Sequence, residues 1–211
     1  MTFDEAMREA ARAAENAVKM TLKKYTFGGI RDEPEITAYL VSQLDSQFDK
    51  PIGGVNWSST IVRNGSGNAA EEKKIGADLL LHVSLNTPIK KYSKGDLIQS
   101  KRAEPDEAIS TNELTKLQTQ CAKMSGYTPG SFVFCYGQKS MRTGSASIFE
   151  LSSDKFIHYS CPWTSYRFFR ELFRCPIGDR RINSARVDDL PIPYVLAVKG
   201  SGDRFDDDHV L

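Results

Sequence analysis

An apolar segment that holds a single acid near its start, ADLLLHVSL at residues 77–85, constrains the fold of this chain more than any other feature. Its composition predicts a β-strand that is buried in the protein interior. An unpaired carboxylate loses its hydration when it is buried, so Asp78 either lies in water at the strand end or binds something positively charged. The segments around it decide between these two alternatives.

A polar segment with Pro, Gly and Asn follows, and it predicts a turn into another strand, LIQSK, at residues 97–101. Because side chains alternate along a strand, Gln99 and Lys101 share one face, about 7 Å apart, while Ser100 points into the core. Antiparallel pairing of the two strands brings Asp78 alongside Gln99 and Lys101. We therefore expect an acid, an amide and a lysine to share one pocket.

The rest of the chain predicts helices on both sides of a run of strands. Two capping-box patterns, Thr2 with Glu5 and Ser110 with Glu113, mark the starts of two helices. We predict helices at about residues 3–28, 33–48, 110–124 and 165–173, and further strands at about 54–62, 131–137, 145–151 and 193–200. This order predicts an α/β fold with one mixed sheet flanked by helices. We expect a single domain over residues 1–211, with a core at about 30–140, a C-terminal elaboration at 141–200 and a tail at 201–211.

Composition excludes several classes of protein. The formal net charge is +1 at pH 7, so any nucleic-acid surface must be built from local clusters of Lys and Arg. The N-terminal segment carries several acids and lacks the apolar core of a signal peptide, and no stretch is long and apolar enough to span a bilayer. The four cysteines form no CxxC pair, which argues against a zinc finger and a disulfide framework. We therefore expect a protein of the reducing cytoplasm with no membrane partner.

The segments GADLLLHV and KGDLIQSKR together resemble the core of the restriction-endonuclease-like nucleases, the PD-(D/E)xK superfamily. The signature of that family is an Asp at the start of one strand and an acid-x-Lys on the next. Asp78 matches the first position, and Gln99, Ser100 and Lys101 match the second as a QxK variant, with glutamine in place of the acid. The resemblance covers roughly residues 33–136. It implies a restriction-endonuclease-like three-layer core and a nuclease that uses Mg²⁺ or Mn²⁺.

The resemblance also implies roles for these residues in phosphodiester hydrolysis. Asp78 is expected to be the principal metal ligand, and the Gln99 side-chain oxygen and the Ser100 backbone carbonyl are expected to be further ligands. Lys101 is expected to orient the attacking water or to stabilise negative charge on the phosphate. Glutamine in place of an acid removes one negative charge, so a second carboxylate should come from elsewhere.

Three glutamates are candidates for this second carboxylate. The family pattern points to the preceding helix, where Glu33 and Glu35 lie, and Glu72 comes just before the strand that carries Asp78. We favour Glu35 as a catalytic residue and then Glu72 as a metal ligand. The helix after the QxK strand carries a glutamine that approaches the active site in some relatives, so Gln120 is expected to lie next to these residues.

Six basic residues are expected to flank the site and to hold phosphate groups: Lys73, Lys74, Lys90, Lys91, Lys94 and Arg102. Each residue also has a plainer interpretation. Glutamates suit the start of any helix, lysines suit solvated loops, and Gln99 with Lys101 could form the exposed face of an edge strand.

The function expected from the resemblance is metal-dependent cleavage of DNA, as in bacterial or phage defence endonucleases. Two alternatives stay open, namely an RNase and a non-catalytic nucleic-acid-binding or assembly protein with the same fold. The replacement of the acid by Gln99 keeps the non-catalytic alternative open. The sequence does not decide between endo- and exonuclease action, and it leaves open a homo-oligomer and a regulatory partner.

Overall fold

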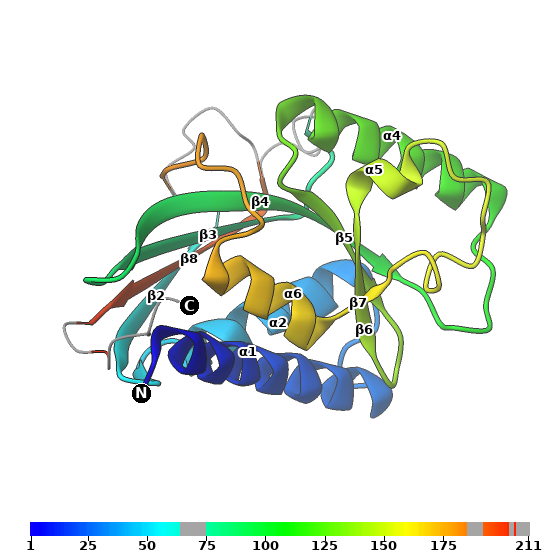
Figure 1. Ribbon diagram of the computed structural model, residues 1–211. Helices are drawn as coiled ribbons and strands as arrows, with labels where there is room; N and C mark the ends of the chain where they lie inside the picture. The colour runs from blue at the N-terminus through cyan, green and yellow to red at the C-terminus, as the bar shows by residue number, and fades with distance from the viewer. Residues whose placement is uncertain (64–74, 185–191, 203–204, 206–211) are drawn as a thin grey trace.

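The computed structural model describes residues 1–63, 75–184, 192–202 and 205 of the chain. In these residues the helices are α1 (Phe3–Thr26), α2 (Glu33–Gln47), α4 (Thr111–Tyr127), α5 (Ala146–Phe149) and α6 (Ser165–Arg174). The strands are β1 (Pro51–Ile52), β2 (Val55–Arg63), β3 (Leu79–Asn86), β4 (Lys91–Arg102), β5 (Ser131–Tyr136), β6 (Met141–Ser145), β7 (Trp163–Thr164) and β8 (Tyr194–Ser201). These strands form one mixed sheet in the order β1-β2-β8-β3-β4-β5-β6-β7 (Figure 1). The chain is therefore a mixed α/β protein, as its sequence predicted.

The hairpin of β3 and β4 lies in the middle of this sheet. The two strands pair antiparallel with Leu79 opposite Ile98, which confirms the pairing predicted from the sequence. β4 begins at Lys91, earlier than the predicted strand at 97–101, and a short turn joins it to β3. β5 runs parallel to β4 on its other side and places Cys135 beside Lys101. The end of β4 that carries Gln99 and Lys101 thus extends past the start of β3 and, among the described strands, pairs with β5 alone.

The C-terminal strand β8 lies inside the sheet rather than at its edge. It is antiparallel to β2 and parallel to β3, so it separates two strands that come earlier in the chain. Its residues 195–198 are apolar and buried, as a strand covered on both faces requires. The sequence-based division into a core at about 30–140 and a C-terminal elaboration therefore does not describe this sheet.

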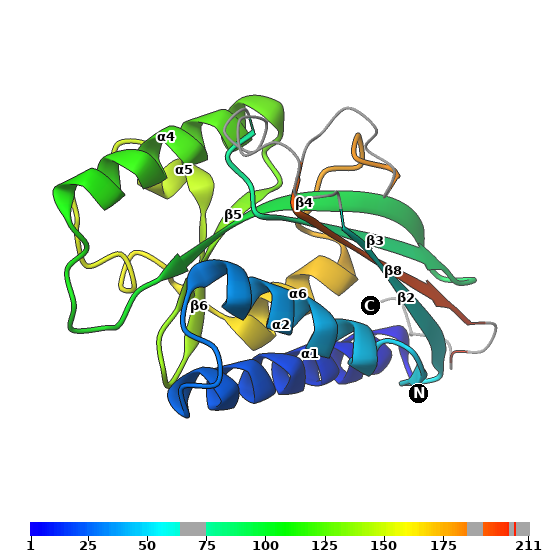
Figure 2. The same ribbon diagram turned by 180° about the vertical axis from the view of Figure 1, so that it is seen from behind.

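Helices cover both faces of the sheet. Helices α1, α2 and α6 lie against one face, and α4 and α5 lie against the other (Figures 1 and 2). The predicted capping boxes are present at the starts of α1 and α4. Buried apolar side chains form one core on each side of the sheet, which gives a three-layer arrangement. No helix within the described residues has the length and apolar character needed to cross a bilayer.

The prediction of a strand at residues 145–151 is wrong. Strand β6 ends at Ser145, and the next residues form the single helical turn α5. Ala146 and Phe149 are buried, whereas Ile148 and Leu151 are exposed. The buried residues are three apart, as on one face of a helix, and a strand would have buried every second residue.

Candidate active site

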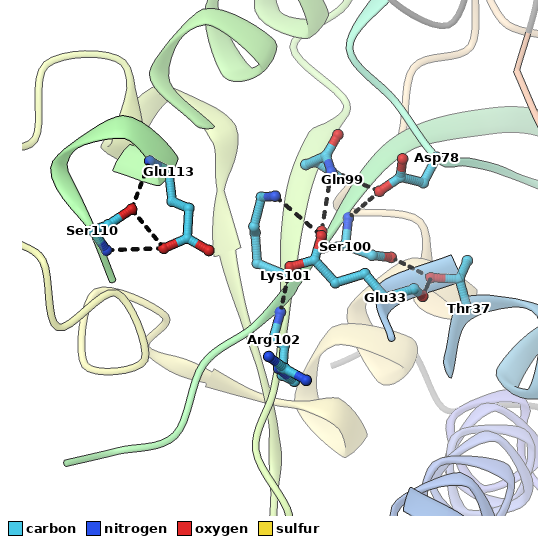
Figure 3. Close-up of polar contacts among 9 residues, drawn as sticks. All are labelled: Glu33, Thr37, Asp78, Gln99, Ser100, Lys101, Arg102, Ser110 and Glu113. Carbon is cyan, nitrogen blue, oxygen red and sulfur yellow. Dashed lines mark hydrogen bonds and ion pairs between the residues drawn. The ribbon is translucent and has the colours of Figure 1, made fainter. Parts of the chain in front are cut away.

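Asp78 lies immediately before β3, and two groups of β4 hold its carboxylate. Its Oδ2 accepts a hydrogen bond of 2.6 Å from Nε2 of Gln99 and one of 2.8 Å from the backbone N–H of Ser100 (Figure 3). The backbone N–H of Asp78 donates to the carbonyl of Ile98 and continues the ladder between the two strands. The predicted neighbourhood of Asp78 and Gln99 is therefore confirmed.

Gln99 is almost completely buried next to Asp78. Its Nε2 also donates to the Ser100 carbonyl at 3.0 Å, so the amide nitrogen has two acceptors. Its Oε1 is buried and has no hydrogen-bond partner among the described residues. A buried acceptor without a donor costs free energy unless something else binds it. This oxygen is therefore a candidate ligand for a cation or a water.

Lys101 lies two residues further along β4 on the same face, and it pairs with a glutamate of α2. Its Nζ lies 3.1 Å from Oε2 of Glu33, and its side chain is only 7% exposed, against 32% for the glutamate. Oε1 of Glu33 accepts a hydrogen bond of 3.0 Å from the backbone N–H of Arg102 (Figure 3). Each oxygen of this carboxylate therefore has a partner on β4.

A buried hydroxyl pair fixes α2 against this part of the sheet. The side chains of Thr37 and Ser100 are hydrogen bonded at 2.8 Å, and the Thr37 hydroxyl also donates to the Glu33 carbonyl. Ser100 thus points into the core, as predicted, and only its backbone reaches the Asp78 carboxylate. Because Thr37 follows Glu33 by one helical turn, this contact holds Glu33 over the end of β4.

The structure does not bring Glu35, the favoured second carboxylate, to this cluster. Glu35 is exposed, and its carboxylate accepts a hydrogen bond of 2.7 Å from the backbone N–H of Arg31 at the start of α2. Glu33 takes the position that the sequence analysis assigned to Glu35. Helical spacing holds the signal that separates them, because Glu33 precedes the buried Ile36 and Thr37 by three and four residues.

Three of the predicted site residues lie outside the described residues: Glu72, Lys73 and Lys74. Of the other basic residues, Arg102 adjoins the site, where one of its guanidinium nitrogens donates to the Arg31 carbonyl at 3.0 Å. Lys90 and Lys91 lie at the opposite end of the hairpin. Lys101 comes ten positions after Lys91, a distance of about 33 Å at the rise of a β-strand. The prediction that these two lysines flank the site is therefore wrong.

Lys94 is not a surface residue at all. It is fully buried, with its ammonium donating to the Ile177 carbonyl and lying 5.0 Å from the centre of the Tyr92 ring. Alternation along β4 turns Lys94 inward together with Asp96 and Ile98. Burial lowers the pKa of Lys94 and raises that of Asp96. The prediction that Lys94 binds nucleic acid is wrong, because its ammonium is not accessible.

The backbone of Gln120 lies close to the entry of β3, and the prediction that its side chain approaches the active site stays a prediction. The backbone of Gln120 packs directly on Gly76, where any Cβ would come within 2.5 Å of the Gln120 carbonyl oxygen. Gly76 also has a φ of +80°, which favours glycine. Oε1 of Gln120 is buried without a hydrogen-bond partner in the described part of the chain. Helix α4 therefore packs directly against Gly76, two residues before Asp78.

The sequence analysis assigned Glu113 to helix capping and did not place it near the site. Its carboxylate accepts hydrogen bonds from the backbone N–H and the hydroxyl of Ser110, and these bonds lower the pKa of Glu113 (Figure 3). The positive charges of Lys101 and Arg102 add to this effect. Glu113 therefore adds negative charge on the α4 side of Lys101.

The oxygen atoms around Asp78 are of the kind that binds a hard cation, but together they carry little negative charge. A carboxylate, the orphaned amide oxygen of Gln99 and the Ser100 carbonyl are oxygen ligands of the kind that Mg²⁺ prefers. Across the described ranges, no group of three or more His, Cys, Asp or Glu side chains converges as a metal site does. In this arrangement the Gln99 amide nitrogen, and not its oxygen, contacts Asp78 and the Ser100 carbonyl, so the three oxygens could bind one cation only after the amide group turns over.

Comparisons with known proteins leave this site to be judged by its geometry. No family model, no curated protein and no solved structure matches the chain.

Proposed function

We propose that this chain hydrolyses phosphodiester bonds in DNA with an active site of the restriction-endonuclease-like kind. The observation that supports this most is the cluster at one end of β4, where Gln99 binds Asp78 while Lys101, two residues on, pairs with Glu33. A structural ion pair alone would use the lysine and one acid. It would leave no reason for a second acid and a buried amide with an unpaired oxygen.

Lys101 is the residue that would act on the reacting phosphate. The Lys101 side chain is nearly buried and its ammonium pairs with Glu33, so the position of this positive charge is fixed before a substrate binds. A fixed positive charge stabilises negative charge that develops on a phosphate oxygen, and it does so without reorganisation during the reaction. Glu33 is then the positioning residue for Lys101, since it also binds the backbone at Arg102.

Asp78, Gln99 and the Ser100 carbonyl would hold Mg²⁺ or Mn²⁺ in this proposal. Such an ion would supply an activated water and a counter-charge for the phosphate. The two hydrogen bonds to Oδ2 of Asp78 keep that carboxylate oriented along β4. The presence of an amide where relatives of this kind carry an acid predicts weak affinity, so activity should require millimolar rather than micromolar ion.

Contacts with the nucleic acid would begin at Arg102. Its side chain is exposed next to Lys101, and only one of its guanidinium nitrogens has a hydrogen bond within the described residues. The remaining N–H groups suit a phosphate flanking the one that is cleaved.

The small number of carboxylates around Asp78 favours a second candidate function. In that alternative, the protein binds nucleic acid on the same surface without cleaving it.

Cleavage of supercoiled plasmid tests the proposal. The wild type should nick or linearise the plasmid with Mg²⁺ or Mn²⁺ and lose this activity in EDTA. Lys101→Met keeps the aliphatic stem and removes the ammonium, so it should reduce turnover roughly a hundredfold or more. Asp78→Asn should abolish cleavage. Lys91→Met, on the same strand but at its far end, is the matched control and should keep the wild-type rate.

Binding measurements separate the enzyme from the binding protein. In the enzyme, DNA affinity measured by fluorescence anisotropy in EDTA should fall far less in Lys101→Met than turnover does, because one phosphate contact is a modest part of the total. DNA binding with no cleavage under any ion condition would overturn the proposal in favour of the binding protein. Cleavage of a labelled RNA of the same sequence, and not of DNA, would show an RNase instead.

A further inference from the structure

Two buried cysteines from different parts of the chain lie in direct contact. Sγ of Cys135, on β5, and Sγ of Cys161, just before β7, are 2.9 Å apart. Both thiols are free and both residues are completely buried. A disulfide bond is about 2.05 Å long, so the sulfurs need to approach by only about 0.9 Å to form one.

The backbone already holds the two cysteines in place. Cys135 pairs with Arg142 across β5 and β6. The guanidinium of Arg142 donates to the Cys161 carbonyl at 3.0 Å and to the Pro162 carbonyl at 3.0 Å. The same arginine therefore links the strand of one cysteine to the segment of the other. These contacts keep the two thiols close together in the folded chain.

We propose that Cys135 and Cys161 form a reversible intramolecular disulfide with a small disulfide, such as oxidised glutathione, as the oxidant. One protein thiolate attacks the S–S bond of the oxidant, which forms a mixed disulfide and releases one small thiol. The second protein thiolate attacks the protein sulfur of that mixed disulfide and releases the second small thiol. The protein loses two electrons and two protons, and the oxidant gains them.

The environment of Cys135 and Cys161 determines the rate of disulfide formation. Burial raises the pKa of Cys135 well above that of a free thiol, and the neighbouring Cys161 thiol adds to this. The thiolate is the reactive form, so the folded protein should react slowly and faster at higher pH. The segment before Cys161 includes the exposed Leu151 and Tyr159, so local opening there would give the oxidant access.

The disulfide would tether the part of the sheet next to the candidate active site. Cys135 lies beside Lys101 in the ladder between β4 and β5, and the loop that the disulfide closes includes all of β6 and α5. The proposal does not depend on nuclease activity, since it concerns the bonding state of two thiols.

Refolding in a redox buffer tests the proposal, because both thiols are accessible to the oxidant before the chain folds and buries them. The full chain is unfolded and reduced, refolded in mixtures of reduced and oxidised glutathione, alkylated and then mapped by mass spectrometry. A peptide that joins Cys135 to Cys161 should appear, and dithiothreitol should remove it. The oxidised protein should melt several degrees above the reduced protein, because the cross-link restricts the unfolded chain.

Matched variants identify the pair. Cys121→Ala removes a third buried thiol on α4 and should leave the cross-link intact, whereas Cys135→Ala and Cys161→Ala should each abolish it. If either alanine variant fails to fold, peptide mapping of the wild type still decides. Two alkylated thiols at positions 135 and 161 after refolding in the most oxidising buffer would overturn the proposal, and so would a cross-link to Cys121.

Discussion

The carboxylate of Glu33, in the first turn of α2, lies 3.1 Å from the ammonium of Lys101 at the end of β4. These two residues are far apart in the sequence and belong to different layers of the fold. Their contact turns a strand-end lysine into a positioned charge, since a nearly buried ammonium is stable only with a partner. Several consequences of this arrangement, and of the buried charges nearby, can be measured.

Replacing Glu33 should affect activity much more than replacing Glu35. Glu33→Gln removes the counter-charge of Lys101, so we expect turnover on DNA to fall roughly a hundredfold and the free energy of unfolding to fall by about 1–3 kcal/mol. Glu35→Gln alters an exposed acid in the same helical turn and should cost less than about 1 kcal/mol with near-normal turnover. Equal activity in the two variants would contradict the role given to Glu33.

A carboxylate at position 99 should make stability depend on divalent ions. In Gln99→Glu an oxygen replaces the nitrogen that now donates to Asp78 at 2.6 Å, so the two carboxylates repel each other. We expect a lower Tm than the wild type in EDTA and a larger rise in Tm on adding Mg²⁺ or Mn²⁺.

Calorimetry or thermal fluorescence measures this change in Tm and needs no activity. Gln118→Glu serves as the control, because the Gln118 side chain binds the Ser152 carbonyl away from Asp78. The same response to ions in both variants would show that Asp78 and Gln99 do not bind the ion.

Alanine at Gly76 should destabilise the protein more than alanine at Gly54. Both glycines have a positive φ, at +80° and +74°, so both substitutions carry a backbone penalty of about 1 kcal/mol. Only at Gly76 does the new Cβ meet the backbone of Gln120 on α4; at Gly54 nothing lies within 4 Å. We expect a loss of about 2–4 kcal/mol at Gly76, measured by urea unfolding. Equal losses at the two positions would show that α4 moves aside without cost.

Asp96 should make the protein less stable as the pH rises through the weakly acidic range. Burial raises the pKa of Asp96 to about 7, while the positive charge of Lys94 opposes this shift and the negative charge of Asp179 adds to it. The folded state therefore binds more protons than the unfolded state between about pH 4 and pH 7, and the free energy of unfolding falls across that window. Asp96→Asn should remove this fall and should be more stable than the wild type at neutral pH. Parallel pH profiles of the two proteins would contradict this assignment.

Asp179 provides a control with the opposite sign. Hydrogen bonds from Arg181 lower the pKa of Asp179 to about 2. Its contribution to stability is present above the pKa of the unfolded chain and is lost as the pH falls from about 4 to about 2. Asp179→Asn should therefore remove the loss of stability on the acid side of the profile. Because the charge of Asp179 adds to the raised pKa of Asp96, this variant should also reduce the fall between pH 4 and pH 7, whereas only Asp96→Asn should remove that fall.

The local patterns of the sequence determined most of the secondary structure and the pairing at the centre of the site. Capping boxes at Thr2 and Ser110 fixed two helix starts, because a side chain and a backbone N–H three residues away satisfy each other locally. Strand alternation and one short turn were enough to place Asp78 beside Gln99. These features depend on neighbours in sequence, so the sequence carries them directly.

Contacts between distant elements decided the rest. The sequence alone did not place β8 between β2 and β3, because the order of strands depends on which apolar faces pack best across the whole sheet. Helical spacing places Glu33, rather than Glu35, on the buried face of α2, but only the contact between α2 and the sheet shows that this face meets Lys101. The sequence predicted Lys94 to be a surface residue, but it is buried and its ammonium donates a hydrogen bond to the Ile177 carbonyl. Whether a charged side chain at such a position is buried depends on how distant segments pack against it, and this cannot be known before the complete fold is known.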